Sequence, residues 1–456
     1  MRDHRGAALM GFLLRRSPAR ALAGWYDTFD RPNESPVKAP WAFWGNVADF
    51  SIVSNRLKLA AETDPARGGT ADGGIAYEHQ PLTENWGFEF TRAPIGTTSV
   101  SSSNETYQTV WIDKNWTEGG AASSTVYQVY LQLQAKYSED EDDEGNVDKD
   151  MDRRVRLMTR EKGTGSIFTP PDSTGSDSVT VGAIAWAAAL SIRIHVYSDR
   201  YMIGWINGYP ELLLDLYDPN YRFGPKKRSA NFAQISGLVA SIDDFKTYDL
   251  PVGLRTNWTS EFFDDFNRAN GTTVGNGWDQ ISNGTFGINN NALSMTSSFS
   301  GSDGFRQVRR GPFPQDVRIE FVFGGGTGDL TLAIRSAILA RMNAAGTKGI
   351  AMIAHPRSVT IHGFTWNGSP GTAPSYTGPT QPILAVGTDY VELGHLLSFN
   401  IVGDIAWVFN HTLDRLIAFR DGIDALAGSN DGWVGAFIAR NAFVNSAPIN
   451  EIRVLV

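Results

Sequence analysis

Apolar and polar residues alternate along several stretches of this chain, which is the pattern of a β-strand with one buried face. Phe88 and Phe90 flank Glu89, and every second residue from 127 to 137 is apolar or aromatic while those between are mostly Gln or Lys. Asn207-Gly208 separates two further apolar runs, and this dipeptide between such runs indicates a hairpin. The pattern therefore predicts antiparallel sheets.

The strand pattern occurs twice. The first copy opens at 27–33 and reaches 55–57, and the second opens at 264–270 and reaches 291–293. The matched pairs are Phe29/Phe266 and Arg31/Arg268, each 237 positions apart, and Ile52/Ile288 and Leu57/Leu293, each 236 apart. Trp44 and Trp278 are interpreted as the corresponding core tryptophans. A repeat of this length predicts two large domains, each with its own core.

The spacing between matched residues sets the expected boundaries. It falls from 231 at Phe90/Phe321 to 203 at Asn207/Asn410 and Asp218/Asp421, so copy one holds 28 more residues in that interval. The expected organisation is an N-terminal arm at 1–23, domain 1 at 24–250 with an acidic hairpin insertion at 138–152, a linker at 251–260 and domain 2 at 261–456. The acidic tip lacks the spaced ligands of a hand-type Ca²⁺ loop, so a solvated loop is favoured.

The N-terminal arm combines arginines with the short apolar run 7–14. A signal peptide cleaved after Ala21-Leu22-Ala23 is one interpretation. An arginine pair directly after the run favours the other, an arm that docks on a partner subunit.

Composition supports sheets and narrows the function. The chain has 13 Trp, 25 Phe, 14 Tyr and 47 Gly, which suits strands and turns. A formal net charge of -9 argues against binding nucleic acid. The lack of Cys excludes disulfides and thiolate chemistry, and no apolar run is long enough for a membrane span.

The repeated opening, followed by Trp, an aromatic strand and a late hairpin, resembles concanavalin A-like (laminin G-like) jelly rolls. In particular, 263–271 resembles the start of such domains in minor tail proteins of tailed actinobacteriophages. The resemblance covers about 25–456. It implies an all-β fold of two tandem antiparallel β-sandwiches, whose faces and end loops often bind saccharide. It also implies a virion location, other tail proteins as partners, and a homo-oligomer, for which a trimer is compatible with tail-tip symmetry.

No catalytic signature is found in either copy, so we do not expect an enzyme. Glu89 and Glu320 each stand alone on a strand, whereas glycoside hydrolases need two carboxylates. No cofactor is expected. The paired acids Asp264-Asp265 and Asp243-Asp244 could hold a Ca²⁺ ion between them. The favoured interpretation is that these acids cap strand ends.

Two tryptophans in polar loops, Trp366 and Trp116, are the candidate glycan contacts, because a flat ring stacks on a pyranose face. The alternative for each is a loop anchor packed on its own domain. The first hypothesis is therefore a structural tail or tail-tip protein that contacts host-surface polysaccharide. A secreted carbohydrate-binding protein is the second, and a glycan-cleaving enzyme with an unrecognised site is the third. The oligomeric state, the glycan and the outward-facing domain stay open.

Overall fold

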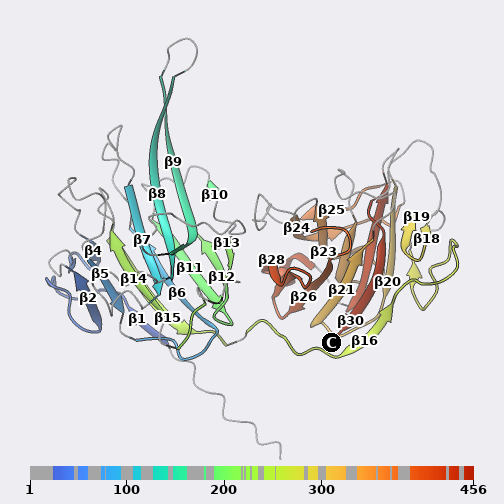
Figure 1. Cartoon of the computed structure of the whole chain (residues 1–456), viewed down its shortest axis with the longest axis horizontal. Coiled ribbons are helices and arrows are strands. Elements are labelled where there is room, and N and C mark those ends of the chain that lie inside the picture. The colour runs from blue at the N-terminus through green and yellow to red at the C-terminus, as the bar shows by residue number, and fades with distance from the viewer. Residues whose placement is uncertain are drawn as a thin grey trace, which may run out of the picture.

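A computed structural model describes most of the chain (Figure 1). The described residues are 24–45, 50–59, 73–77, 79–93, 106–113, 127–141, 147–161, 179–180, 189–216, 219, 222–225, 228–234, 241–251, 253–281, 286–295, 304–324, 336–355, 358–369, 372–377, 391–427, 431–440 and 446–456. The predicted arm at 1–23 lies outside them. Within them, no helix is long and apolar enough to cross a bilayer.

The chain forms two tandem antiparallel β-sandwiches of the jelly-roll type, as the strand pattern predicts. Domain 1 has an eight-stranded sheet A and a seven-stranded sheet B. Sheet A contains β13 (Tyr209–Asp215), β12 (Tyr201–Ile206), β11 (Leu190–Tyr197), β6 (Trp86–Arg92), β15 (Ser241–Asp249), β4 (Leu57–Leu59) and β3 (Phe50–Ile52), with β1 (Gly24–Asp27) also beside β15. Sheet B contains β10 (Val179–Thr180), β9 (Val147–Glu161), β8 (Tyr127–Glu141), β7 (Thr106–Asp113), β14 (Arg228–Gln234), β5 (Gly73–Tyr77) and β2 (Trp41–Gly45).

Domain 2 repeats this arrangement in sheets C and D. Sheet C contains β18 (Phe286–Ile288), β19 (Leu293–Met295), β30 (Ile449–Leu455), β21 (Val317–Phe323), β26 (Leu396–Val402), β27 (Ile405–Asn410) and β28 (Arg415–Asp421), with β16 (Ser260–Asp264) also beside β30. Sheet D contains β17 (Asp279–Gln280), β20 (Gly304–Arg310), β29 (Trp433–Arg440), β22 (Ala337–Met342), β23 (Lys348–His355), β24 (Ser358–Thr365) and β25 (Ser375–Thr377). The helix α1 (Ile423–Ala427) contributes Ile423 and Ala427 to the core.

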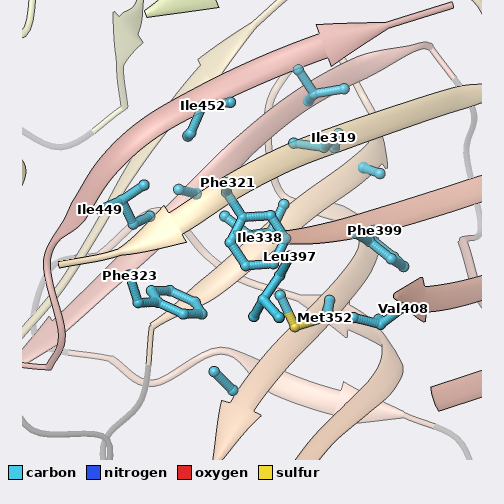
Figure 2. Packing of buried hydrophobic residues seen from close by; sticks show 14 of the residues in the cluster. Ile319, Phe321, Phe323, Ile338, Met352, Leu397, Phe399, Val408, Ile449 and Ile452 are labelled. Atoms are coloured by element: carbon cyan, nitrogen blue, oxygen red, sulfur yellow. The ribbon is translucent and has the colours of Figure 1, made fainter. Parts of the chain in front are cut away.

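Each core lies between the two sheets of its domain. In domain 2, alternate residues of β21 point inward, including Ile319, Phe321 and Phe323, and they meet Ile338 and Met352 from sheet D (Figure 2). Domain 1 packs Phe88 and Phe90 of β6 in the same way. Burial of these alternating rings is the main source of stability in each sandwich.

The repeated opening motif forms a clasp that is the same in both domains. Asp27 accepts hydrogen bonds from the Phe29 backbone N–H (2.8 Å), Arg31 Nη1 (2.7 Å) and Trp41 Nε1 (2.7 Å). In domain 2, Asp264 accepts from Phe266 N–H (2.8 Å), Arg268 Nη1 (2.7 Å) and Trp278 Nε1 (2.8 Å). The interpretation of Trp44 as the partner of Trp278 is therefore wrong. Trp41 holds that position because its indole N–H reaches the buried carboxylate.

A matched turn also recurs. Ser54 and Asn55 have φ of 53° and 61°, and Asn290 and Asn291 have φ of 52° and 57°. Two consecutive left-handed residues suit a tight turn between twisted antiparallel strands, here β3–β4 and β18–β19.

The late hairpins need two corrections to the residue matching. Ile206 and Asn410 end the first strand of their hairpins, so Asn410 corresponds to Ile206 and not to Asn207. Tyr201 pairs with Asp215, and Ile405 pairs with Asp421 in the corresponding ladder. Asp215 therefore corresponds to Asp421, and Asp218, which the spacing matched to Asp421, lies outside the described residues. Both hairpins carry a register shift at the same place, between Gly204 and Trp205 in one and between Val408 and Phe409 in the other.

The described parts of the predicted acidic insertion, 138–141 and 147–152, lie at the far end of the paired strands β8 and β9, which extend beyond the other strands of their sheet (Figure 1). The β7–β8 ladder ends at the Thr106–Ala135 pair, whereas the β8–β9 ladder continues to Glu141 and Val147. Among the described residues, this outer part is a two-stranded ribbon.

Candidate functional site

The outer face of sheet D carries a second set of aromatic side chains, which we call the aromatic face. Strand alternation sends one set of residues into the core and the other set outward. The outward rings come from β20, β24, β25 and β29 and from the residue after β24. They are Phe305, Phe364, Trp366, Tyr376, Trp433 and Phe437.

Phe437 lies at the centre of this face. Its ring makes edge-to-face contacts with Phe364, at 5.4 Å between centroids, and with Trp366, at 5.2 Å. Such pairs contribute about 0.5–1.5 kcal/mol beyond the burial of area. Arg309 extends the face towards β20, since its guanidinium lies 4.6 Å above the Trp433 ring.

Trp366 is 4% exposed in this arrangement. Its indole Nε1 donates to the Thr372 carbonyl (2.9 Å), and its backbone N–H donates to the Thr347 carbonyl (2.7 Å). These contacts match the alternative interpretation of Trp366 as a loop anchor, and its ring offers no open face for a sugar. Trp116 lies outside the described residues.

The accessible part of the aromatic face is its edge at β25. Tyr376 is 39% exposed, and its neighbours Ser375 and Thr377 are also exposed. Tyr376 lies directly opposite Phe364 in the ladder, so both rings are on the outer face. The His362 ring lies 6.1 Å from that of Tyr376. Burial, followed by the charge of Arg420, lowers the pKa of His362, which keeps this imidazole neutral near pH 7.

Sequence reasoning missed Tyr376. The available signal was an aromatic residue between two hydroxyl residues after a Gly/Pro-rich loop. Such an edge offers one partly open ring, hydroxyl groups and a neutral imidazole. This set can stack on a sugar and exchange hydrogen bonds with its hydroxyls.

The two strand glutamates singled out in the sequence lie on the outer faces of sheets A and C, where each is paired with a cation. Glu89 accepts from Lys246 Nζ at 2.7 Å, and Glu320 lies 2.7 Å from Arg318 and 3.6 Å from Arg453. Glu89 and Glu320 occupy corresponding strands, so the cross-strand ion pair is a shared feature of the repeat.

Ser398 and His411 form the nearest approach to a nucleophile and base in the described part of the chain. Ser398 Oγ lies 2.9 Å from His411 Nε2, which also receives Arg318 Nη2 at 2.7 Å. Ser398 is 0% exposed and Asn400 Nδ2 donates to its hydroxyl. A buried hydroxyl that is already an acceptor serves as part of a structural network.

The suggested Ca²⁺ site between Asp264-Asp265 and Asp243-Asp244 is wrong. Asp264 belongs to β16, which pairs with β30, whereas Asp243 belongs to β15, which pairs with β1 and β6 of the other domain. The Asp264 carboxylate also already accepts hydrogen bonds from Phe266, Arg268 and Trp278. Among the described residues, no group of three or more acidic, His or Cys side chains is arranged to hold a metal.

Comparison with known proteins yields similarity of fold. No protein-family model matches the chain, and no curated protein matches it. Similar solved structures include β-agarase B from Zobellia galactanivorans (10% identity, 50% of this chain and 93% of that one, TM-score 0.34). The endo-1,3-β-glucanase of Streptomyces sioyaensis has 10% identity, coverage of 51% and 98%, and a TM-score of 0.31. The carbohydrate-binding module CBM66 of Bacillus subtilis has 16% identity, coverage of 39% and 91%, and a TM-score of 0.24. These neighbours are carbohydrate-binding and glycoside hydrolase proteins, and at such scores they carry no inference about activity.

Proposed function

We propose that this chain is a structural component of a virion, a minor tail or tail-tip protein, that binds a host-surface saccharide through the edge of the aromatic face. The tail assignment is supported by the resemblance of 263–271 to the start of phage tail domains. The saccharide assignment rests on one observation, the half-open Tyr376 ring between Ser375 and Thr377 at an edge strand.

A binding role fits the chemistry of this edge. Tyr376 presents an apolar ring and a hydroxyl, so it can stack on a sugar and donate a hydrogen bond at the same time. His362 stays neutral near pH 7 and adds a donor or an acceptor. The cation-paired Glu89 and Glu320 lie away from this edge, on sheets A and C, so we propose binding without hydrolysis.

A glycan array of host cell-wall polysaccharides tests the binding step. Tyr376→Ala should lose the signal, because it removes the stacking ring without emptying the core. Tyr26→Ala is the matched control, because Tyr26 is a 70% exposed ring of β1 in the other domain. If Tyr376→Ala binds as well as the wild type, the assigned edge is wrong.

Mass spectrometry of purified virions tests the tail assignment. A tail component should be found in the particles, together with other tail proteins, and sedimentation of the purified chain should show a homo-oligomer. A chain that is absent from virions but active on the array would instead be a secreted carbohydrate-binding protein. Release of reducing sugar from host cell walls would overturn the non-enzymatic assignment.

A further inference from the structure

The hairpins β12–β13 and β27–β28 meet each other across the two domains. They occupy corresponding ends of sheets A and C, and β13 and β28 are the corresponding edge strands. Their outward side chains form one apolar cluster with residues of the linker, which we call the joint. Its buried members are Tyr197, Ile203, Trp205, Leu213, Leu250, Trp407, Leu416 and Phe419, and Leu254 and Trp258 of the linker pack against them.

The bulge residues of both hairpins make contacts across the joint. Trp205, at the bulge of the domain 1 hairpin, packs edge-on against Phe419 at 5.8 Å between centroids. Phe409, at the corresponding bulge of domain 2, packs edge-on against Tyr201 at 6.2 Å. Each bulge residue therefore meets the other domain's hairpin, so the two hairpins contribute the same position to the joint.

The corresponding aspartates Asp215 and Asp421 both accept hydrogen bonds across the joint. Asp215 of domain 1 accepts from the Leu416 backbone N–H of domain 2 at 3.0 Å. Asp421 of domain 2 accepts from Trp205 Nε1 of domain 1 at 2.7 Å. The Arg193 guanidinium lies 4.3 Å above the Trp205 ring and 3.7 Å from Asp421, which adds a cation to the second contact.

Asp215 is also the centre of a buried charge cluster. Arg200 Nε donates to one of its carboxylate oxygens at 2.6 Å and Arg200 Nη2 to the other at 3.1 Å, and Arg415 Nε lies 4.0 Å away across the joint. Arg200 Nη1 donates to the Asp414 carboxylate of domain 2 at 3.0 Å. Asp215, Arg200 and Arg415 are 4%, 7% and 6% exposed. Separating the domains would leave Arg415 and the Leu416 N–H without this acceptor.

We propose that the joint is a permanent interface through which each jelly roll recognises a second copy of its own fold, so that the two domains act as one rigid body. The linker is then a connection and not the element that holds the domains together. A hydrophobic patch with desolvated, hydrogen-bonded charges is the composition of stable interfaces, whereas flexibly linked domains meet through more polar surfaces.

Cleavage of the linker in the full-length protein tests this. A specific protease site is inserted after Thr256, the chain is cut, and the halves are followed by size-exclusion chromatography at micromolar concentration. The halves should elute together with unchanged circular dichroism. Two separate peaks that both retain β-sheet circular dichroism would overturn the proposal, because the joint would then depend on the linker.

Variants locate the interaction. Asp215→Ala in the cleavable chain should release the halves, because it removes the carboxylate that accepts from the Leu416 N–H across the joint and that binds the buried Arg200. Asp414→Ala removes an exposed carboxylate that pairs with Arg200 from across the joint, and it should speed dissociation of the halves while leaving both folded. The matched control is Asp199→Ala, which breaks an Arg228 ion pair inside domain 1. If Asp215→Ala fails to fold, the cut wild type and Asp414→Ala still test whether the joint holds the halves together. Release of the halves by Asp199→Ala alone would contradict the assignment of the interaction to the joint.

Discussion

Replacement of the clasp carboxylate in domain 2 should loosen that domain alone. Asp264→Asn keeps the size of the side chain but removes its charge and one acceptor oxygen. The carboxylate now accepts from Arg268 through both Nη1 and Nη2, from the Phe266 N–H and from Trp278 Nε1. The asparagine amide would place a donor against at least one of these donors.

The magnitude follows from this set of bonds. Hydrogen bonds to a charged group contribute about 1.5–3 kcal/mol, and breaking a buried ion pair costs about 3–5 kcal/mol. The Arg268 side chain is 29% exposed and can rehydrate when its partner is lost. The expected loss of unfolding free energy is therefore at the lower end of the range for a buried ion pair, about 3 kcal/mol. That is a large share of a domain stability of about 5–15 kcal/mol.

Hydrogen exchange measured by mass spectrometry resolves the effect by strand. The backbone amides of β16 and β30 should exchange about two orders of magnitude faster in Asp264→Asn, at about 1.4 kcal/mol per tenfold change. β1 and β15 should be unchanged. Asp27→Asn is the matched variant and should reverse the pattern. Wild-type protection of β30 in Asp264→Asn, or equal loss in both domains, would refute the reasoning.

The same variant has a pH signature. Burial alone would raise the pKa of Asp264, but the bonds from Arg268, Phe266 and Trp278 outweigh it and lower the pKa below its usual value. A lowered folded-state pKa gives stability that is present above the unfolded pKa of about 3.9 and is lost as pH falls through the folded value. The difference between wild type and Asp264→Asn should therefore shrink as the pH falls below about 4.

Three further predictions concern the core, a turn and a buried histidine. Phe321→Ala should lower the unfolding free energy of domain 2 by about 3–5 kcal/mol in urea, because Phe321 is 0% exposed; a loss under 1 kcal/mol would contradict the packing. Asn291→Val should cost about 1–2 kcal/mol at a φ of 57° while Asn291→Gly is nearly neutral, and equal melting temperatures of the two variants would exclude the left-handed turn. Burial, followed by the charge of Arg193, lowers the pKa of His195 to about 3. Below about pH 6.5 the His195 imidazole is therefore protonated in the unfolded chain but not in the folded one. The unfolding free energy should fall by up to about 1.4 kcal/mol for each unit of decreasing pH. His195→Gln should reduce that slope in urea titrations from pH 7 to 5, and an unchanged slope would show that His195 protonates while folded.

Periodicity and the repeat were sufficient to predict much of the fold. Alternation around Glu89 requires a strand with one buried face, and Phe88 and Phe90 are buried as expected. The Asn207-Gly208 pair predicts a hairpin, and both residues have positive φ in the turn between β12 and β13. These features depend on neighbours in the chain, so they can be read from one sequence.

Side chains whose role depends on distant partners were harder to assign. Trp41 lies 237 positions before Trp278, the spacing that Phe29/Phe266 and Arg31/Arg268 share, so the repeat itself selects Trp41 over Trp44, and the bond to the Asp27 carboxylate gives the physical reason. Trp366 is in a loop of turn-forming residues, which suggests exposure, yet Phe437 and the Thr372 carbonyl bury it. For Trp366 the deciding contact is with Phe437, which comes from another strand and which spacing along the chain does not bring near.

The joint was missed for a different reason, because its signal is an exception to alternation. A strand with one solvated face alternates, whereas a strand buried on both faces is apolar throughout. β12 and β13 belong to the second kind, since Met202 and Leu214 enter the core while Ile203 and Leu213 face the other domain. β27 repeats the pattern with Val408 inside and Trp407 outside. Two corresponding hairpins that are apolar on both faces in a duplicated chain therefore indicate that the copies dock on each other, because only a second apolar surface can bury the outward side chains of both.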